Sequence, residues 1–225
     1  MMEINRPVFS KLIYIMITAS IFVGCGRERS NVSKWTPEDS TRIVKEILAH
    51  RSRVDSSFRS DPQSPFVRDT SIRFTGIKWF LPNLNYYLTS KLSKHEKPET
   101  VQIYGTKGDA RRYIKYGYFT FELDGDSYKL NAYKFTADDS RRSSIYKKYL
   151  SVWFTDETTG KETYPVGRYI DVGEEYDDPN HLYTLNFNNA YNPYCAYSSL
   201  YSCAVPRKED HLAVAVKAGE LKNHN

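Results

Sequence analysis

The sequence predicts a mainly β protein, either an antiparallel β-sandwich or a barrel-like domain, with one N-terminal α-helix. Three observations support this fold class. A helical pattern opens the domain, strand-like runs follow it at roughly 8–15-residue spacing, and the 19 Tyr and 11 Phe favour strands. Because the helix comes first and the strands follow, the order argues against a doubly wound parallel sheet.

The predicted helix covers residues 36–59. Thr36 can cap its first turn, and Pro37 suits the position after the cap. The run ends before Pro62, which stops a helix. Apolar residues recur at helical spacing and predict one buried face: Ile43, Ile47, Val54 and Phe58.

The predicted strands begin on either side of Gly76, at residues 72–74 and 77–79. Asp124-Gly125-Asp126 separates two alternating runs and predicts a hairpin turn, because Gly supplies a positive φ. The runs predicted as strands after Gly76 are residues 84–88, 118–123, 128–135, 149–155, 169–172, 182–187 and 212–216.

Residues 1–24 are predicted to be a lipoprotein signal peptide. Arg6 and Lys11 give a basic start, and the uncharged apolar run LIYIMITASIFV follows at residues 12–23. A helix of that length rises only about 18 Å, which is too short to cross a membrane.

The four residues Phe22-Val23-Gly24-Cys25 resemble the bacterial lipobox, after which the new N-terminal Cys is acylated. Phe22 stands where Leu is usual. The resemblance implies lipidation of Cys25 and a location in the bacterial cell envelope, lipid-anchored, facing the periplasm or on the outer membrane. Gly26 is not the Asp that some bacteria use for inner-membrane retention, which favours the outer membrane. An ordinary signal peptide with a chance Cys is the alternative.

Residues 25–35 are predicted to be the lipidated Cys and a flexible tether, and residues 36–221 a single β-rich domain. No later apolar run reaches the about 18 residues that a membrane helix needs. The net charge is +5, with basic residues interspersed among acidic ones. The pattern therefore predicts a membrane contact through the lipid and no nucleic-acid partner.

Three blocks of sequence carry a resemblance to a known family. They are residues 51–80, which include FTGIKWF, residues 154–171 (FTDETTGKETYPVGRYID), and residues 185–220, which begin with LNFNNAYNPYCAYSSLYSC and end with AGE. Together they resemble the bacterial domain of unknown function 1684 family over about residues 45–220. The resemblance implies kinship and an exported or membrane-associated setting, and it supplies no mechanism.

The sequence departs from the family pattern at three positions of the last block. Asn186 stands where the family has Asp, Tyr194 where Pro is usual, and Asp210 where the family has Asn. The first departure argues against an acid role at position 186.

Two cysteines of the last block decide between a continuous helix and a disulfide-linked loop for this segment. In a straight helix Cys195 and Cys203 would lie about 12 Å apart, whereas a disulfide needs Cα atoms within about 7 Å. If Cys25 is lipidated, these two thiols remain in an oxidising compartment, which predicts a disulfide and a compact loop over residues 188–203 with at most one helical turn.

Two further interpretations of these cysteines are weaker. Metal binding by Cys195, Cys203 and His211 would need ligands eight residues apart, unlike the short spacings of zinc sites. A nucleophilic Cys needs a free thiol beside a base. We therefore predict neither a metal site nor a cofactor.

The candidate ligand-binding residues come from the second and third blocks: Arg168, Asp171, Asn186, Asn188, Tyr191 and Asn192. The guanidinium of Arg168 could grip a ligand carboxylate or phosphate, because its fork matches such groups. The alternative is a partly buried Arg that fixes a loop through Glu162 or Asp171. Asn residues more often form turns with their own backbone than bind a ligand, and Glu220 could pair with Arg168 or Arg51.

Three functions follow from these candidates. The first is a non-enzymatic module that binds a small molecule or an envelope component. The second is a hydrolase-like enzyme in which Glu162 or Asp171 acts as a base, while Arg168 and Asn188 stabilise charge. The third is a purely structural lipoprotein. Whether the protein is an enzyme stays open, with binding favoured because no nucleophile–base pair is evident.

Overall fold

The computed structural model describes Met1, residues 34–137 and residues 144–223. The predicted signal peptide after Met1, Cys25 and most of the predicted tether lie outside the described residues. Within the described ranges, no helix combines the length and apolarity that crossing a membrane requires.

The predicted N-terminal helix is present as α1 (Pro37–Ser60). The hydroxyl oxygen of Thr36 accepts a hydrogen bond from the backbone N–H of Asp39 at 3.0 Å, which caps the first turn. Ile43, Ile47 and Phe58 are buried, as their spacing predicts. A short second helix, α2 (Pro65–Arg68), follows.

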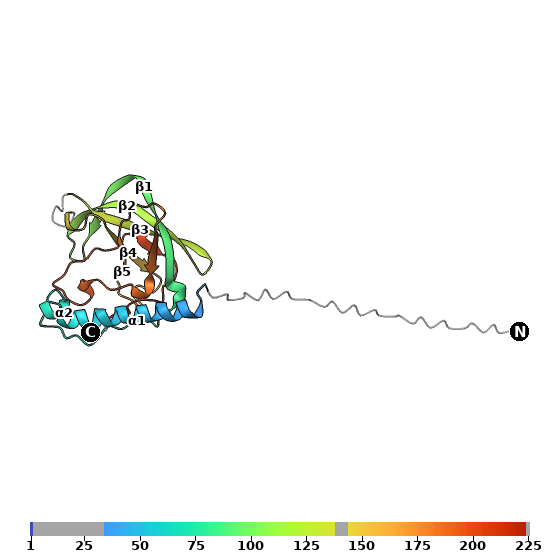
Figure 1. Ribbon diagram of the computed structural model, residues 1–225, viewed down its shortest axis with the longest axis horizontal. Coiled ribbons are helices and arrows are strands. Elements are labelled where there is room, and N and C mark those ends of the chain that lie inside the picture. Colours follow the sequence, from blue (N-terminus) through green and yellow to red (C-terminus); the bar gives the residue numbers. More distant parts are fainter. Residues whose placement is uncertain (2–33, 138–143, 224–225) are drawn as a thin grey trace. The chain divides into compact units, whose positions relative to one another are not determined.

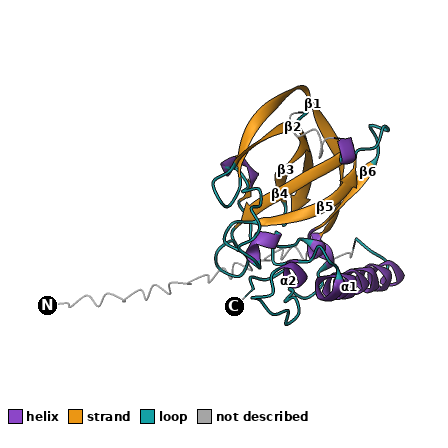
Figure 2. Ribbon diagram, turned by 90° about the vertical axis from the view of Figure 1, so that its left-hand side faces the viewer, coloured by secondary structure: helices purple, strands orange, loops and turns teal. Residues whose placement is uncertain are grey.

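Six antiparallel strands form the body of the domain, with the order β5-β4-β3-β2-β1-β6 in the sheet. The sheet curls until its end strands, β5 and β6, approach each other, so the barrel is nearly closed (Figure 2). The strands are β1 (Tyr87–Tyr104), β2 (Ala110–Leu123), β3 (Asp126–Phe135), β4 (Tyr149–Asp156), β5 (Arg168–Glu174) and β6 (Leu182–Asn186).

The hairpin between β2 and β3 turns where the sequence predicts it. Asp124 has a φ of 54° and Gly125 a φ of 94°. Two successive positive φ values match the twist of the flanking strands, which is why Asp-Gly favours this turn. The predicted turn is therefore confirmed.

Helix α1 lies across one end of the barrel (Figures 1 and 2). The barrel interior is filled by apolar side chains from all six strands and from the segment after β6, among them Phe119, Leu130, Phe154, Leu185 and Phe187. A smaller aromatic cluster contains Val101, Ile103, Tyr113, Tyr133, Trp153 and Ala204. The main cluster holds the barrel together through apolar burial.

Two predictions about strands were wrong in extent. β1 continues far beyond the run predicted, because its Lys- and Glu-rich part, residues 91–100, is largely exposed and shows no alternation. β2 begins eight residues before the run predicted, at Ala110. Residues 72–79 form no strand beyond a single bridge between Trp79 and Glu220. In the exposed part of β1, Leu92–Lys94 and the residues from Glu99 onward pair with β2, with a register shift between Lys94 and Glu99.

The predicted strand 212–216 is also mostly absent. Only His211–Leu212 pairs, as β7, and it runs parallel to β4. The segment after it forms no further strand and carries Val216, Ala218 and Glu220 into buried positions. Short 3₁₀ turns complete the fold: η1 (Leu84–Tyr86), η2 (Phe187–Asn189), η3 (Tyr194–Ala196) and η4 (Lys208–Asp210).

Candidate functional site

A cavity of about 510 Å³ lies between α1 and the barrel, and we call it the helix–barrel cleft. One wall is the face of α1, and the other walls are β5 and the C-terminal segments. The lining residues are His50, Val54, Ser57, Phe58, Tyr169, Tyr191, Pro193, Tyr194, Tyr201, Cys203 and Glu220.

Aromatic rings dominate the walls of this cleft. Tyr169 and Tyr191 meet edge to face, with ring centroids 5.8 Å apart. Across from α1, the Tyr194 ring lies 5.8 Å from that of Phe58 and 5.2 Å from that of Tyr201, again at steep angles. Edge-to-face contacts of this kind hold rings in fixed orientations, so the walls are preformed.

A second cavity of about 250 Å³ adjoins the outer side of the sheet, and we call it the sheet-side cavity. Tyr169, Tyr191 and Cys203 line both cavities. Arg111 lines the sheet-side cavity, but its Nε donates to Asp109 at 2.7 Å and its Nη2 to the carbonyl of Ser202 at 2.8 Å. Its charge is therefore already paired.

Glu220 supplies the buried carboxyl group of the helix–barrel cleft. The residue is 0% exposed. Its Oε2 accepts hydrogen bonds from the N–H of Asn192, at 2.8 Å, and from the hydroxyl of Tyr197, whereas Oε1 has no partner. Burial raises the pKa of this carboxyl to about 7, although both hydrogen bonds act to lower it.

The backbone around Gly219 places this carboxyl. Gly219 has a φ of +81°, and a Cβ built there would lie 2.5 Å from the carbonyl oxygen of Ala190. Only Gly fits this approach. The N–H of Glu220 donates to the same carbonyl at 2.8 Å, and Gly219 accepts from the N–H of Phe80 at 2.9 Å. The C-terminal segment is thus held on both sides.

Arg168 fixes the same segment from within the core and is 1% exposed. Its Nη2 donates to Asp156 at 2.6 Å and to the carbonyl of Val216 at 2.9 Å, and its Nη1 donates to the carbonyl of Ala218. The predicted pairing of Arg168 with Glu162 or Asp171 is wrong, because Asp156 takes that place. All these contacts are internal, so Arg168 does not reach either cavity.

The three Asn candidates bond mainly to backbone. The side chain of Asn188 exchanges two hydrogen bonds with the backbone of Asn83, at 2.7 and 2.9 Å. Asn186 accepts from the N–H of Asn188 at 3.1 Å. Asn192 donates to the carbonyl of Leu221 at 2.9 Å, and its Oδ1 is buried without a partner.

The acidic candidates are likewise dispersed. Asp171 is exposed, and its Oδ1 accepts from the N–H of Gly173 at 2.9 Å. Glu162 forms an exposed ion pair with Lys217 at 3.5 Å. The hydrolase-like hypothesis needed one of these carboxylates beside Arg168 and Asn188, which are both buried and internally bonded. The structure therefore gives that grouping no access to a substrate in either cavity.

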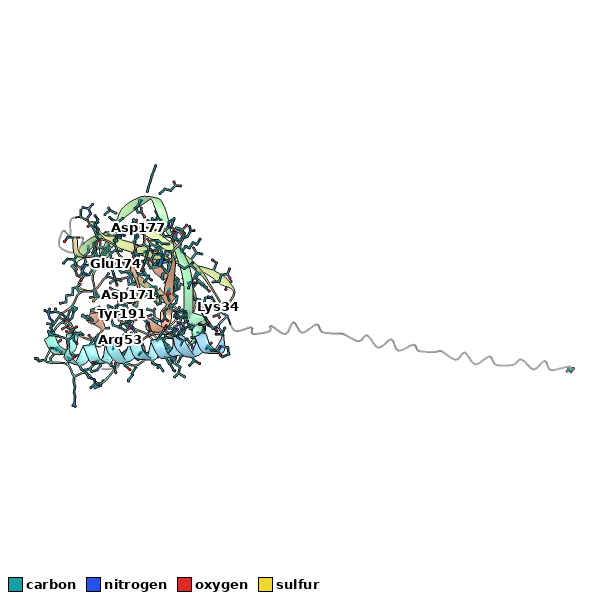
Figure 3. All side chains as sticks on the ribbon, viewed as in Figure 1. Lys34, Arg53, Asp171, Glu174, Asp177 and Tyr191 are labelled. Atoms are coloured by element: carbon teal, nitrogen blue, oxygen red, sulfur yellow. The ribbon has the colours of Figure 1, made fainter. Side chains whose placement is uncertain are left out.

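Among the six candidate ligand-binding residues, all of them in the described part of the chain, Tyr191 is the one that lines the two cavities. Figure 3 shows it between Asp171 on β5 and Arg53 on α1. Its backbone pairs with that of Tyr169 through two hydrogen bonds of 2.9 Å. Burial, together with Tyr149 and Asp171, raises its pKa well above the usual value, so its hydroxyl stays neutral.

The predicted Cys195–Cys203 disulfide is absent, and both residues are free thiols. They are nevertheless neighbours, because the N–H of Cys195 donates to Sγ of Cys203 at 3.3 Å. The loop through residues 188–203 is compact, with η3 as its short helical turn, as predicted. Each sulfur takes part in hydrogen bonds here, where the prediction assumed a covalent bond.

Sequence reasoning missed His50, which is not among the candidate residues named above. His50 lines the helix–barrel cleft one turn before Val54 on α1. Burial lowers its pKa, the charge of Arg53 lowers it further, and Asp171 opposes the shift. Its spacing of four and eight residues from Val54 and Phe58 was the signal that could have placed it on the buried side.

The metal hypothesis for the cysteines gains no support. His211 accepts or donates a hydrogen bond with Thr155 at 3.1 Å and lies 3.3 Å from Glu157. Within residues 34–137 and 144–223, no three His, Cys, Asp or Glu side chains gather in a way that could hold a metal ion.

Comparisons with known proteins agree with this fold. The family described as "Protein of unknown function (DUF1684)" matches residues 72–221. Among solved structures, the chain is similar to an uncharacterized protein of Haloarcula marismortui determined by NMR. The identity is 34%, the TM-score is 0.59, and the match covers 83% of this chain and 97% of that one. No curated protein matches the chain.

Proposed function

The chain belongs to the family described as Protein of unknown function (DUF1684), and because that description assigns no activity, we propose a function from the geometry of its cavities. The domain is a binding module that takes a small organic molecule into the helix–barrel cleft. The observation that carries this proposal is the unpartnered Oε1 of Glu220, buried at a cavity of about 510 Å³.

Three features of the cleft support binding. Its volume falls within the range of about 300–1,000 Å³ that small-molecule sites have. Its walls are mostly aromatic, with few polar groups, which is the usual composition of such sites. A buried carboxylate oxygen without a hydrogen bond is costly, and a ligand that donates to Oε1 of Glu220 would remove that cost.

We further propose that the domain is exported and held at a bacterial membrane by acyl chains on Cys25. The support is the short apolar run at residues 12–23 between basic residues and the Gly24-Cys25 pair. The polar segment 26–35 would then separate the binding domain from the lipid surface.

Membrane fractionation of cells that make Cys25→Ala tests the anchor. The variant should leave the membrane fraction, whereas Cys203→Ala, which removes a different thiol, should stay with the wild type. Membrane association that persists in Cys25→Ala would contradict the anchor.

Native mass spectrometry of the protein purified from its own cells tests binding. The wild type should retain an added mass that Val54→Trp loses, because a Trp at this position fills the helix–barrel cleft. The control is Ser52→Trp, on the exposed face of the same helix, which should retain the ligand. Circular dichroism would show that both variants are folded.

The result that overturns the binding proposal is equally specific. It fails if no added mass appears on the wild type and a library of small organic molecules shifts the melting temperatures of wild type and Val54→Trp alike. An added mass that survives in Val54→Trp would place binding outside the helix–barrel cleft and would overturn it too.

A further inference from the structure

We propose that the helix–barrel cleft binds an alkylated ammonium cation, whose charge faces Oε1 of Glu220 and whose alkyl groups lie among the tyrosine rings. This inference rests on the proposed function and adds the chemical class of the ligand to it. It depends on three observations: the carboxyl oxygen of Glu220 that has no hydrogen-bond partner, the aromatic walls of the cleft, and the charges around it.

The carboxyl of Glu220 accepts two hydrogen bonds, and neither comes from a cationic side chain. Asn192 and Tyr197 both bond to Oε2, and Oε1 is buried without a partner. Among the described residues, no Lys, Arg or His forms an ion pair with this side chain. Burial favours the neutral form of this carboxyl, and a cation that donates a hydrogen bond to Oε1 would favour its charged form.

The two nearest arginines are engaged elsewhere. Nη1 and Nη2 of Arg51 donate to the carbonyls of Phe80, at 2.8 Å, and Asn188, at 3.0 Å. Arg168 is paired with Asp156, and its hydrogen bond to Glu220 goes to the main-chain carbonyl, at 3.5 Å. The pairing of Glu220 with either arginine that the sequence allowed is therefore absent. Both arginines act electrostatically on Glu220, but neither donates a hydrogen bond to its carboxyl oxygens, so Oε1 remains open to a donor on a ligand.

The walls select the kind of cation. Tyr169, Tyr191, Tyr194 and Tyr201 all line the cleft, with Phe58 beside Tyr194. The faces of such rings attract cations, and cages of aromatic rings recognise ammonium groups that carry alkyl substituents. A small inorganic cation would need several oxygen ligands, whereas this cleft offers one free carboxylate oxygen.

The charges around the cleft do not compete with such a ligand. His50 faces the cleft, but burial and the charge of Arg53 lower its pKa, so it is mostly neutral at pH 7. Asp171 lies close enough to raise the pKa of Tyr191, and Asp61 acts similarly on Tyr194. Arg53 is exposed on α1. Ligands with a net negative charge would be repelled by Glu220.

Titration calorimetry with choline and its uncharged isostere 3,3-dimethylbutan-1-ol tests the inference. Wild type should bind choline at least about tenfold more tightly than the isostere, as a buried charge interaction predicts. Glu220→Gln should remove that preference, because Gln keeps an oxygen for Asn192 and Tyr197 and loses the charge. Glu162→Gln, the same change at an exposed acid, should keep it.

A second pair of variants tests the walls. Tyr191→Leu and Tyr194→Leu keep apolar contact but lose the ring face. Each should therefore lower the affinity for choline more than the affinity for the isostere. Equal affinity of wild type for choline and isostere, or a preference that survives in Glu220→Gln, overturns the inference. A native ligand without a positive charge would overturn it as well, while the binding function itself would stand.

Discussion

Nη2 of Arg168 lies 2.6 Å from Oδ2 of Asp156, and the two side chains are 1% and 0% exposed. Asp156 also accepts from the N–H of Thr158 at 2.8 Å and from its hydroxyl at 2.5 Å. The pair joins β5 to the end of β4, and the second amino group of Arg168 holds the C-terminal segment that carries Glu220. Arg168, a candidate ligand-binding residue in the sequence, is therefore part of an internal brace.

Arg168→Ala is expected to lower the free energy of unfolding by about 3–5 kcal/mol, because it leaves Asp156 buried and without its cation. Urea denaturation measures this. The control is Lys217→Ala, which removes the exposed ion pair with Glu162 and should cost less than about 1 kcal/mol. A loss of similar size in both variants would refute the brace.

Gly219→Ala should be more destabilising than Gly108→Ala. Both residues have a φ of +81°, but a Cβ at Gly219 would meet the carbonyl of Ala190 at 2.5 Å, whereas nothing lies within 4 Å of one at Gly108. The shared strain is about 1–2 kcal/mol, so the difference in unfolding free energy isolates the clash. Equal losses of unfolding free energy in the two variants would show that the C-terminal segment can shift away from the Ala190 carbonyl without cost.

Glu175→Gln should destabilise the protein at pH 7 and have little effect near pH 2. Burial would raise the pKa of Glu175, but hydrogen bonds from Lys134, Lys94 and Tyr116 outweigh it and lower the pKa to about 2. A lowered carboxyl pKa gives stability that is present above pH 4.5 and is lost as the pH falls toward 2, up to about 3 kcal/mol. Unfolding of Glu175→Gln at several pH values measures it, with the exposed Glu174→Gln as the control.

Glu220 should act on stability in the opposite direction. Its pKa is raised from 4.5 to about 7, so its contribution is present below pH 4.5 and is lost as the pH rises through 7. The unfolding free energy of Glu220→Gln minus that of wild type should therefore rise by up to about 3 kcal/mol between pH 4.5 and pH 8. Subtraction removes the contributions of the other titrating groups, which both proteins share. A difference in unfolding free energy that does not change with pH would contradict a raised pKa for the buried Glu220 carboxyl.

Cys195 should react with iodoacetamide at pH 7 faster than Cys203. Hydrogen bonding from the Cys203 thiol lowers the pKa of Cys195 to about 6, whereas that same contact and burial raise the pKa of Cys203. Peptide mass mapping after short exposure measures the ratio. Under denaturing conditions without reductant both thiols should be labelled. Failure of both to react would show the disulfide that the sequence predicted.

Local patterns were sufficient for the elements whose signals lie within a few residues. The cap at Thr36 and the spacing of Ile43 and Ile47 predicted α1, and Asp124-Gly125 predicted the β2–β3 hairpin. In each case the interaction that forms the element is local. The outer part of β1 escaped prediction because its side chains are exposed on both faces, and only its partner strand defines it.

The candidate site was predicted less completely. The sequence singled out Tyr191, which lines both cavities, and Arg168, which lines neither of them. His50 belongs to the cleft, although the sequence analysis did not name it as a candidate. Nothing local distinguishes a charged residue that braces the core from one that faces a ligand, because the difference depends on partners far away in the chain.

The sequence by itself determined that this protein has a capped amphipathic helix ahead of antiparallel strands, and that it shares long motifs with one family. Only the tertiary structure decided that Arg168 is neutralised by Asp156 while Glu220 keeps one oxygen unpaired at an aromatic cleft. The physical reason is that helix capping and turn geometry are set by neighbouring residues. The burial and pairing of a charge are set by whichever distant groups the folded chain places beside it.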